Sequence, residues 1–239
     1  MDDYTSRLIR TIEKAQQVNK TTLPDRAYAA FLFDMDGTLL TSIRSAERVW
    51  SAWATRHGLD VETFLPTLHG KRTHDTIRQL GLPGVDPIAE AAWITAAEIE
   101  DVADIEAING AAAFLASLPP DRWGIVTSAP RALAKARLAA AGLPSKNLLV
   151  AAEDVEHGKP APDPFLLGAR KLGAAPAECL VFEDTLTGLK SAAAAGMDSI
   201  VVTVTHTHPL EITVPAVLDY ADLRAEAGPD GLRVLRKRG

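Results

Sequence analysis

Apolar and polar positions along the chain follow two periods. From residue 110 onward, short apolar runs typical of buried strands take turns with stretches in which apolar residues recur at helical spacing. The strand-like runs are 123–127, 148–152, 179–183 and 199–204, and the helical stretches are 111–118, 131–141, 164–172 and 186–195. Strands that alternate with helices of about ten residues predict an α/β fold, with a Rossmann-like parallel sheet and helices on both of its faces.

The apolar run at 30–33 predicts a first strand, but residues 42–108 break the alternation. Apolar residues recur there at helical spacing in 49–57 and again in 87–108, and strand signals are nearly absent. The simplest interpretation is a small helical cap inserted after the first strand, where it overhangs that strand's end as a lid. We therefore expect an N-terminal extension at 1–28, an α/β core at 29–41 and 109–239, and a helical cap domain at 42–108.

Composition narrows the class of protein. Of the 239 residues, 47% are hydrophobic and 23% charged, which is ordinary for a soluble globular protein. A net charge of −6 argues against nucleic acid as a partner, and no apolar stretch approaches the roughly 20 residues of a membrane span. The one cysteine, Cys179, cannot form an internal disulfide, which fits a reducing compartment. We expect a cytoplasmic monomer without a membrane partner, and a solvated basic tail at 233–238.

The first strand ends in two acids, Asp34 and Asp36, followed by Gly37. Because the backbone turns just past a strand end, both acids can converge on one point above the sheet edge. Two carboxylates beside a glycine that permits close backbone approach suit a divalent cation and a phosphate group. A calcium loop would continue with further acids, whereas Leu39 and Leu40 follow here.

Three other predicted strands end in compatible side chains. Thr127 and Ser128 offer hydroxyl groups, Lys159 follows the next strand, and Glu183 and Asp184 end the one after it. Each of these features alone has a plainer explanation as a helix cap or a surface charge. Their joint occurrence at the carboxyl ends of parallel strands, where active sites of such sheets lie, predicts a single site.

These motifs resemble those of the haloacid-dehalogenase superfamily of phosphohydrolases. The matching segments come in the family's order, span residues 30 to 206, and are Asp-Met-Asp-Gly-Thr-Leu at 34–39, Thr-Ser at 127–128, Gly-Lys-Pro at 158–160 and Phe-Glu-Asp-Thr-Leu-Thr-Gly at 182–188. The helical insert resembles that superfamily's small helical cap. Segments 49–59, 69–77 and 118–128 resemble sugar- and polyol-phosphate phosphatases, including the glycerol-phosphate and 2-deoxyglucose-6-phosphate enzymes.

The resemblance implies a Mg²⁺ cofactor and an aspartyl-phosphate intermediate. Asp34 would attack phosphorus and bind the metal together with Asp184, while Asp36 would contribute its backbone carbonyl to the metal. The Asp36 carboxyl would protonate the leaving group and later take a proton from water. Lys159 would offset the charge of the phosphate, and Glu183 would orient a metal-bound water.

Substrate contacts are expected from two places. Thr127 and Ser128 would bind the phosphoryl oxygens, where charge develops. His69, Lys71 and Arg72 lie between two helical stretches of the insert, where a loop tip would project toward the site. The expected substrate is a small phosphorylated sugar or polyol.

Two alternatives remain open at this stage. A phosphomutase similar to β-phosphoglucomutase would carry Asp and His in the hinge after the first motif, but residues 41–46 hold neither, and Thr41 stands where many family phosphatases have Asp. A phospho-accepting signalling module similar to a receiver domain would lack both the acid at Asp36 and the inserted helices.

Overall fold

The computed structural model describes residues 22–68, 70–145, 148–207, 210 and 212–237. The core strands and helices that the apolar pattern predicts, from 30–33 to 199–204, begin and end within two residues of their predicted positions. Of the expected extension at 1–28, residues 1–21 lie outside this description. No helix in the described ranges is long and apolar enough to cross a membrane.

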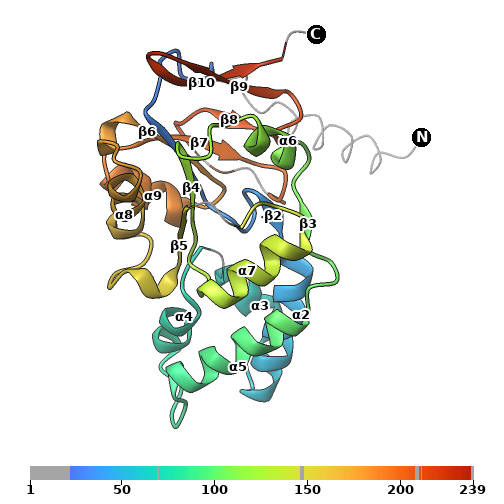
Figure 1. The fold of residues 1–239 in the computed structure, drawn as a ribbon. Helices are drawn as coiled ribbons and strands as arrows, with labels where there is room; N and C mark the ends of the chain where they lie inside the picture. Colours follow the sequence, from blue (N-terminus) through green and yellow to red (C-terminus); the bar gives the residue numbers. More distant parts are fainter. Residues whose placement is uncertain (1–21, 69, 146–147, 208–209, 211, 238–239) are drawn as a thin grey trace, which may run out of the picture.

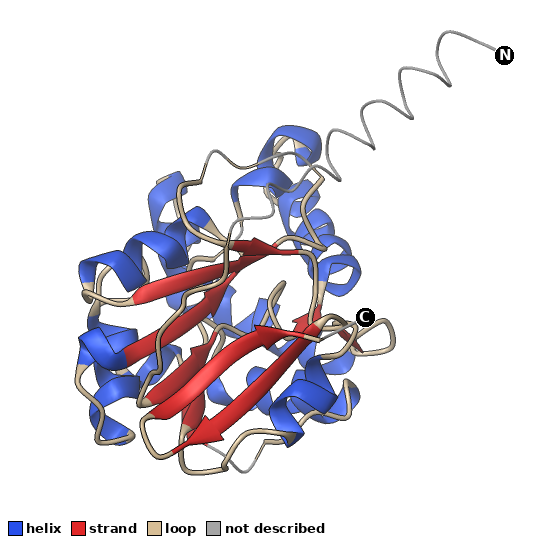
Figure 2. Ribbon diagram, turned by 90° about the horizontal axis from the view of Figure 1, so that it is seen from above, coloured by secondary structure: helices blue, strands red, loops and turns tan. Residues whose placement is uncertain are grey.

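A six-stranded parallel sheet forms the core (Figure 2). Its strand order is β5-β4-β1-β6-β7-β8. In that order the strands are Leu148–Val150, Trp123–Val126, Ala30–Phe33, Cys179–Glu183, Asp198–Val202 and Ala216–Val217. The predicted parallel sheet is confirmed.

Helices cover both faces of the sheet because successive strand residues point to opposite sides. On β1, Phe31 and Phe33 pack with α6 and α7, whereas Leu32 packs with α8 and α9. Phe33 pairs in register with both Ile125 and Phe182, so β1, β4 and β6 end level and the residues after them meet at one edge. The helices are α6 (Ala111–Ala116), α7 (Arg131–Ala140), α8 (Asp163–Lys171) and α9 (Leu186–Ala194).

The remaining helices form a separate unit with its own apolar core. We call α2–α5 the helical unit; its members are α2 (Ile43–Arg56), α3 (Val61–Phe64), the 3-10 turn η1 (Leu65–Thr67), α4 (Thr73–Leu80) and α5 (Pro87–Glu100). Trp53 and Ile94 are fully buried at its centre. A short antiparallel pair, β2 (Leu40–Thr41) and β3 (Glu106–Ala107), leads into and out of it. Figure 1 shows this unit at the end of the molecule opposite β9 and β10.

The chain ends in an antiparallel hairpin that the apolar pattern did not predict. Strands β9 (Leu223–Gly228) and β10 (Gly231–Arg236) pair with each other, and Leu232 bridges to Tyr28 beside the sheet. Leu232 and Val234 are buried in the main core. The expected solvated tail is therefore wrong for residues 233–236, because alternate residues of this basic segment face inward. Two further 3-10 turns, η2 (Ala152–Asp154) and η3 (Pro176–Glu178), lie between core elements.

Candidate active site

A buried lysine joins the ends of three strands. Lys159 Nζ donates hydrogen bonds to Asp34 Oδ1 at 2.5 Å, to Glu183 Oε1 at 2.8 Å and to the Val126 carbonyl at 3.0 Å. The Lys159 side chain is 1% exposed. Asp34 follows β1, Val126 ends β4 and Glu183 ends β6, so the level strand ends bring these groups together. The structure thus unites at one edge the residues that the sequence places after separate strands.

Glu183 is held on both carboxylate oxygens. Besides the bond from Lys159, its Oε2 accepts from the backbone N–H groups of Asp184 and Thr185 at 2.8 Å each, and from Thr185 Oγ1 at 3.0 Å. A Cβ atom on Gly188 would lie 1.5 Å from Glu183 Oε1, so glycine is needed for α9 to pack against this carboxylate. Glu183 therefore fixes both the lysine and the start of the Asp184 loop.

Carboxylates outnumber cations in this cluster. Ligand oxygens of Asp34, Glu183 and Asp184 lie within 4.8 Å of one another. Burial raises the pKa of Asp34, an effect that Lys159 opposes. Burial also raises the pKa of Asp184 well above its usual value, and the neighbouring carboxylates raise it further. A hard divalent cation with oxygen ligands would relieve this excess charge, so the donor set fits a metal.

The turn after β1 brings backbone up to this cluster. The Met35 carbonyl accepts the N–H groups of three residues that follow it, Thr38, Leu39 and Leu40. Thr38 Oγ1 donates to Asp184 Oδ1 at 3.1 Å. Gly37 has φ +85°, and a Cβ atom on it would lie 2.0 Å from Asp184 Oδ2. Only glycine permits this approach, as the sequence indicated.

The Asp36 carboxylate bonds to residues outside the cluster of Asp34, Glu183 and Asp184. Its Oδ1 accepts from Ser42 Oγ at 2.7 Å and from Arg137 Nη1 at 2.9 Å. The side chain of Arg137 is 6% exposed and also pairs with Glu98 of α5 at 3.1 Å. The two acids of the first motif thus face different partners.

The expected phosphate-binding hydroxyls have protein partners here. Thr127 Oγ1 accepts from the Ala129 N–H at 3.0 Å, which fixes the turn after β4. Ser128 Oγ donates to the Gly70 carbonyl of the helical unit at 3.1 Å. Both hydroxyls lie at the strand edge where the sequence places them, and Ser128 also links the core to the insert.

The residues predicted to contact the substrate from the insert have different partners in the structure. Arg72 Nε donates to Asp75 Oδ2 at 2.6 Å, and Arg72 Nη1 reaches the Glu156 carbonyl at 3.0 Å, just before the Lys159 segment. Lys71 Nζ donates instead to Gln79 of α4 at 3.2 Å. His69 lies outside the described residues. Arg72 therefore reaches the core, whereas Lys71 bonds within the helical unit.

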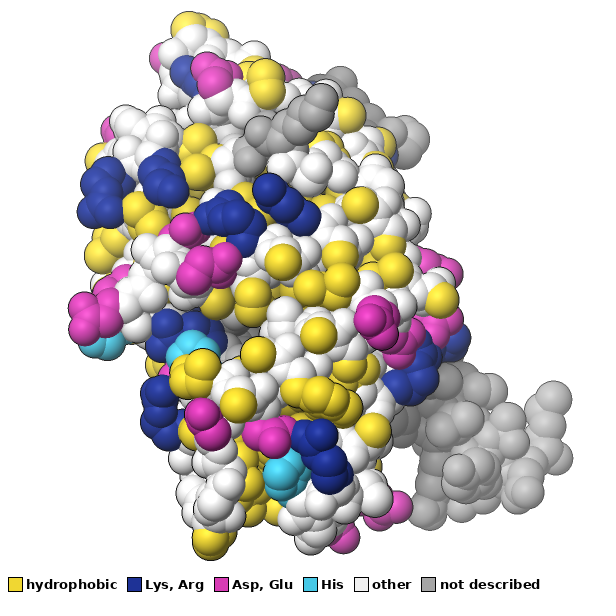
Figure 3. Space-filling model, turned by 60° about the horizontal axis from the view of Figure 1, so that its bottom comes forward, with side chains coloured by type: hydrophobic (Ala, Val, Ile, Leu, Met, Phe, Trp, Pro, Cys, Tyr) yellow, Lys and Arg dark blue, Asp and Glu magenta, His cyan; other side chains and the backbone are white. Residues whose placement is uncertain are grey.

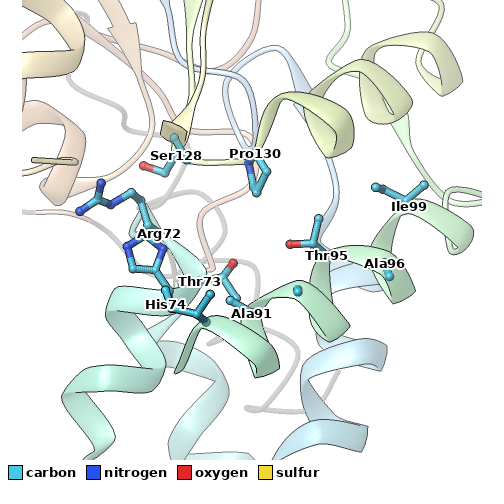
Figure 4. Close-up of a pocket in the computed structure, with 12 residues that line it drawn as sticks. Arg72, Thr73, His74, Ala91, Thr95, Ala96, Ile99, Ser128 and Pro130 are labelled. Atoms are coloured by element: carbon cyan, nitrogen blue, oxygen red, sulfur yellow. The ribbon is translucent and has the colours of Figure 1, made fainter. Parts of the chain in front are cut away.

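A cleft of about 390 Å³ separates the helical unit from the core. Figure 4 shows Arg72 and Ser128 at one end of it, with Thr95 and Ile99 of α5 farther along. Ser128, which lines the cleft, lies two residues after Val126, whose carbonyl accepts a hydrogen bond from Lys159 Nζ. In Figure 3, which brings the helical unit forward, hydrophobic side chains alternate with separate groups of charged ones. The cleft has room for a small molecule between the helical unit and the core.

Residues 28–196 match the haloacid dehalogenase-like hydrolase family. That range contains the whole carboxylate cluster and the helical unit. The chain belongs to this family.

Two relatives of the chain are bacterial sugar- or polyol-phosphate phosphatases. Hexitol phosphatase A of Escherichia coli K12 is 44% identical over 176 residues, which cover 72% of this chain and 82% of that protein. Fructose-1-phosphate phosphatase YqaB of the same organism is 34% identical, over 72% of this chain and 95% of that one. The chain is accordingly a phosphoric monoester hydrolase.

Among solved structures, CbbY of Rhodobacter sphaeroides has a TM-score of 0.71 to this chain at 24% identity, covering 82% of this chain and 96% of that one. This likeness shows the shared fold.

Several contacts at the site were not predicted from the sequence. Arg137 sits in the apolar stripe of α7 beside Leu133 and Leu138, and a charge at such a position was the available signal. His206 lies in the loop after β7. Its Nε2 also donates to the Asp184 carbonyl at 2.7 Å. No sequence pattern joins His206 to a residue 22 positions earlier.

Proposed function

We propose that this hydrolase is a Mg²⁺-dependent phosphatase of a small sugar or polyol phosphate, with Asp34 as its nucleophile. The observation that carries the proposal is Lys159, which is buried between Asp34 and Glu183 beside a further carboxylate, Asp184. A phosphate dianion repels a carboxylate nucleophile, so cationic charge at this point is what the reaction requires. The names of the hexitol and fructose-1-phosphate phosphatases support the substrate class.

Mg²⁺ would be held by the carboxylates of Asp34 and Asp184 and by the backbone carbonyl of Asp36. When bound, it would neutralise charge on the phosphoryl oxygens. The excess of buried negative charge in the cluster supports this assignment.

In the first step, a carboxylate oxygen of Asp34 forms a bond to phosphorus. The bond from phosphorus to the sugar oxygen breaks, and its electron pair stays on that oxygen, which takes a proton from the Asp36 carboxyl. Lys159, Thr127 and Ser128 bind the phosphoryl oxygens during the transfer.

In the second step, water attacks phosphorus, and the bond to the Asp34 oxygen breaks to release phosphate. Asp36, now a carboxylate, takes a proton from that water. Glu183 orients the reacting groups through the lysine and the Asp184 backbone, both of which it binds.

The helical unit, within the insert at 42–108, acts as the cap that selects the substrate. Arg72, with Lys71 and His69 nearby in the chain, would meet the sugar or polyol; the contact of Arg72 with the core loop supports its nearness to the site. We further propose that the enzyme works as a cytoplasmic monomer. Its single cysteine suits a reducing compartment, and the clustered site residues come from one chain.

Phosphate release from a panel of esters with Mg²⁺ tests the function. The panel contains hexitol phosphates, fructose 1-phosphate, glycerol phosphate and 2-deoxyglucose 6-phosphate, with Asp34→Asn protein and chelator as controls. We expect release from at least one ester, loss of it in chelator and recovery with Mg²⁺. If the wild-type enzyme releases no more phosphate than the Asp34→Asn protein from every ester, the proposed substrate class is contradicted. Full activity in the presence of chelator would contradict the proposed dependence on Mg²⁺.

A further inference from the structure

Arg137 connects three parts of the molecule. It belongs to α7 of the core, its Nη1 binds Asp36 Oδ1 at 2.9 Å, and its Nη2 binds Glu98 Oε1 at 3.1 Å. Glu98 belongs to α5 of the helical unit, and its side chain is 4% exposed. The arginine therefore spans the interface between the helical unit and the turn that carries Asp36.

Burying an arginine between two helices is energetically unfavourable compared with burying an apolar side chain. Taking a charge out of water carries a large free-energy penalty, and well-packed apolar residues often stabilise the folded state as much as a buried ion pair or more. The neighbouring buried positions of α7, Leu133 and Leu138, are apolar as expected. The guanidinium does offer something that leucine cannot, because its planar fork fixes hydrogen-bond partners in set directions.

The contacts of Asp36 are arranged to orient its carboxyl group. Both of its hydrogen bonds with described residues, from Ser42 and from Arg137, end on Oδ1. Two donors on one oxygen determine which way the carboxyl plane faces. They also leave Oδ2 as the atom that can carry a proton, since Oδ1 accepts hydrogen bonds whether or not the group is protonated.

We propose that Arg137 is a positioning residue that aims the Asp36 carboxyl at the leaving group, and that Glu98 couples this orientation to docking of the helical unit. The inference rests on the proposed function, in which Asp36 protonates the leaving oxygen. When the helical unit lies on the core, Glu98 holds one arm of the guanidinium and the other arm holds Asp36. When the unit moves away, Arg137 loses its second anchor and Asp36 is less firmly aimed.

The test compares leaving groups. A sugar alkoxide needs a proton as it departs, whereas p-nitrophenolate does not, so poor aim by Asp36 should harm sugar phosphates selectively. The measured quantity is kcat/KM, which reports steps up to loss of the leaving group, for the best sugar phosphate and for aryl phosphates of graded leaving-group pKa.

The variants are chosen to keep the fold. Arg137→Met combined with Glu98→Gln removes both charges of the interface pair and leaves no lone carboxylate at position 98. Arg137→Lys keeps the charge but lacks the fork, and serves if the double variant does not fold. Arg131→Met is the matched control, because it removes an ion pair of the same helix, with Asp154, that does not touch Asp36.

We expect the double variant to lose on the order of 10- to 100-fold in kcat/KM for the sugar phosphate and less than about threefold for p-nitrophenyl phosphate. Arg137→Lys should lose less with the same selectivity, and Arg131→Met should match wild type. The inference would be overturned if the double variant lost kcat/KM equally on all esters, or if it folded and lost none.

An Asp36→Asn background separates this inference from the proposed function. Asp36→Asn alone should steepen the dependence on leaving-group pKa, and adding the Arg137 and Glu98 changes should steepen it no further. If Asp36→Asn itself shows no such dependence, the acid role in the proposed function fails. If it does and the Arg137 variants do not, only the positioning role fails.

Discussion

Asp34 and Asp36 stand two positions apart and meet different chemistry. Asp34 Oδ1 binds the Lys159 ammonium among buried carboxylates, while Asp36 Oδ1 binds Ser42 and Arg137 toward the helical unit. Two carboxyl groups of one motif can therefore serve as nucleophile and as proton carrier because their surroundings differ.

This division predicts unequal effects of removing each acid. Asp34→Asn should abolish turnover, because an amide cannot attack phosphorus. Asp36→Asn should lose on the order of 10²–10⁴-fold in rate and keep its affinity for Mg²⁺, because only its backbone carbonyl is assigned to the metal. Steady-state kinetics and Mg²⁺ titration calorimetry measure the two quantities. Weak metal binding by Asp36→Asn would contradict the assigned ligands.

The buried carboxylates predict a dependence of stability on pH. Folding raises the pKa of Asp184, so this group favours the folded state below its usual pKa near 4 and disfavours it increasingly as the pH rises. In metal-free protein, Asp184→Asn should melt close to wild type near pH 4 and above it at neutral pH, by a margin that grows with pH. Mg²⁺ should reverse the order by stabilising wild type. A margin that stays constant across this range would argue against the assigned charge excess.

At the scale of residues, the sequence indicates which side chains are candidates for the site, but it does not indicate which of them contact one another. Asp34 and Asp184 directly follow apolar strands, which is a local pattern. Lys159 follows β5 only after the turn η2 and a loop, and its signal was the Gly-Lys-Pro motif at 158–160. The pair between Asp36 and Arg137 joins positions 101 residues apart through the packing of helices, and no local pattern encodes it.

At the scale of elements, the contact between the helical unit and the core predicts that Arg72 contributes to substrate selection. Arg72 reaches from the helical unit to the Glu156 carbonyl of the core, whereas Lys71 bonds within the unit to Gln79. Arg72→Ala should lower kcat/KM for the best sugar phosphate by on the order of tenfold and lower it much less for p-nitrophenyl phosphate, which needs little help from a cap. Lys71→Ala is the comparison and should act in the same direction. A loss of equal size on both substrates would indicate damage to the core.

The C-terminal hairpin predicts an effect on stability alone. Leu232→Ala empties a fully buried site and should lower the free energy of unfolding by about 2–5 kcal/mol. Leu218→Ala, at a side chain 58% exposed, should change it by less than about 0.5 kcal/mol. Urea unfolding measures both, and kcat/KM should match wild type in each. Little change in Leu232→Ala would mean that the hairpin does not contribute to the core.

The same hairpin shows why a sequence interpretation can fail for an element. Gly228-Pro229-Asp230-Gly231 is a strong turn signal, and apolar residues alternate on both sides of it. The basic residues from Arg233 onward suggested a solvated tail and obscured that alternation. The inward-facing Leu232 and Val234 determine where the segment lies, because burying them outweighs the cost of ordering the strand.

At the scale of the molecule, the parallel sheet and the helical insert followed from periodicity, which is repeated along the chain. The placement of the insert on the core depends on single contacts, those of Arg137, Arg72 and Ser128, which periodicity does not contain. Arg72 and Ser128 also line the cleft between the two units, so a molecule bound there would meet residues of both.

The central claim is that Asp34 receives the phosphoryl group. Rapid acid quenching of the Mg²⁺-bound enzyme during turnover of its best substrate, followed by peptide mass spectrometry, tests it directly. The account predicts one added phosphoryl group on the peptide that contains Asp34, and none on that peptide in Asp34→Asn. A phosphoryl group on another residue, or turnover by Asp34→Asn, would contradict it.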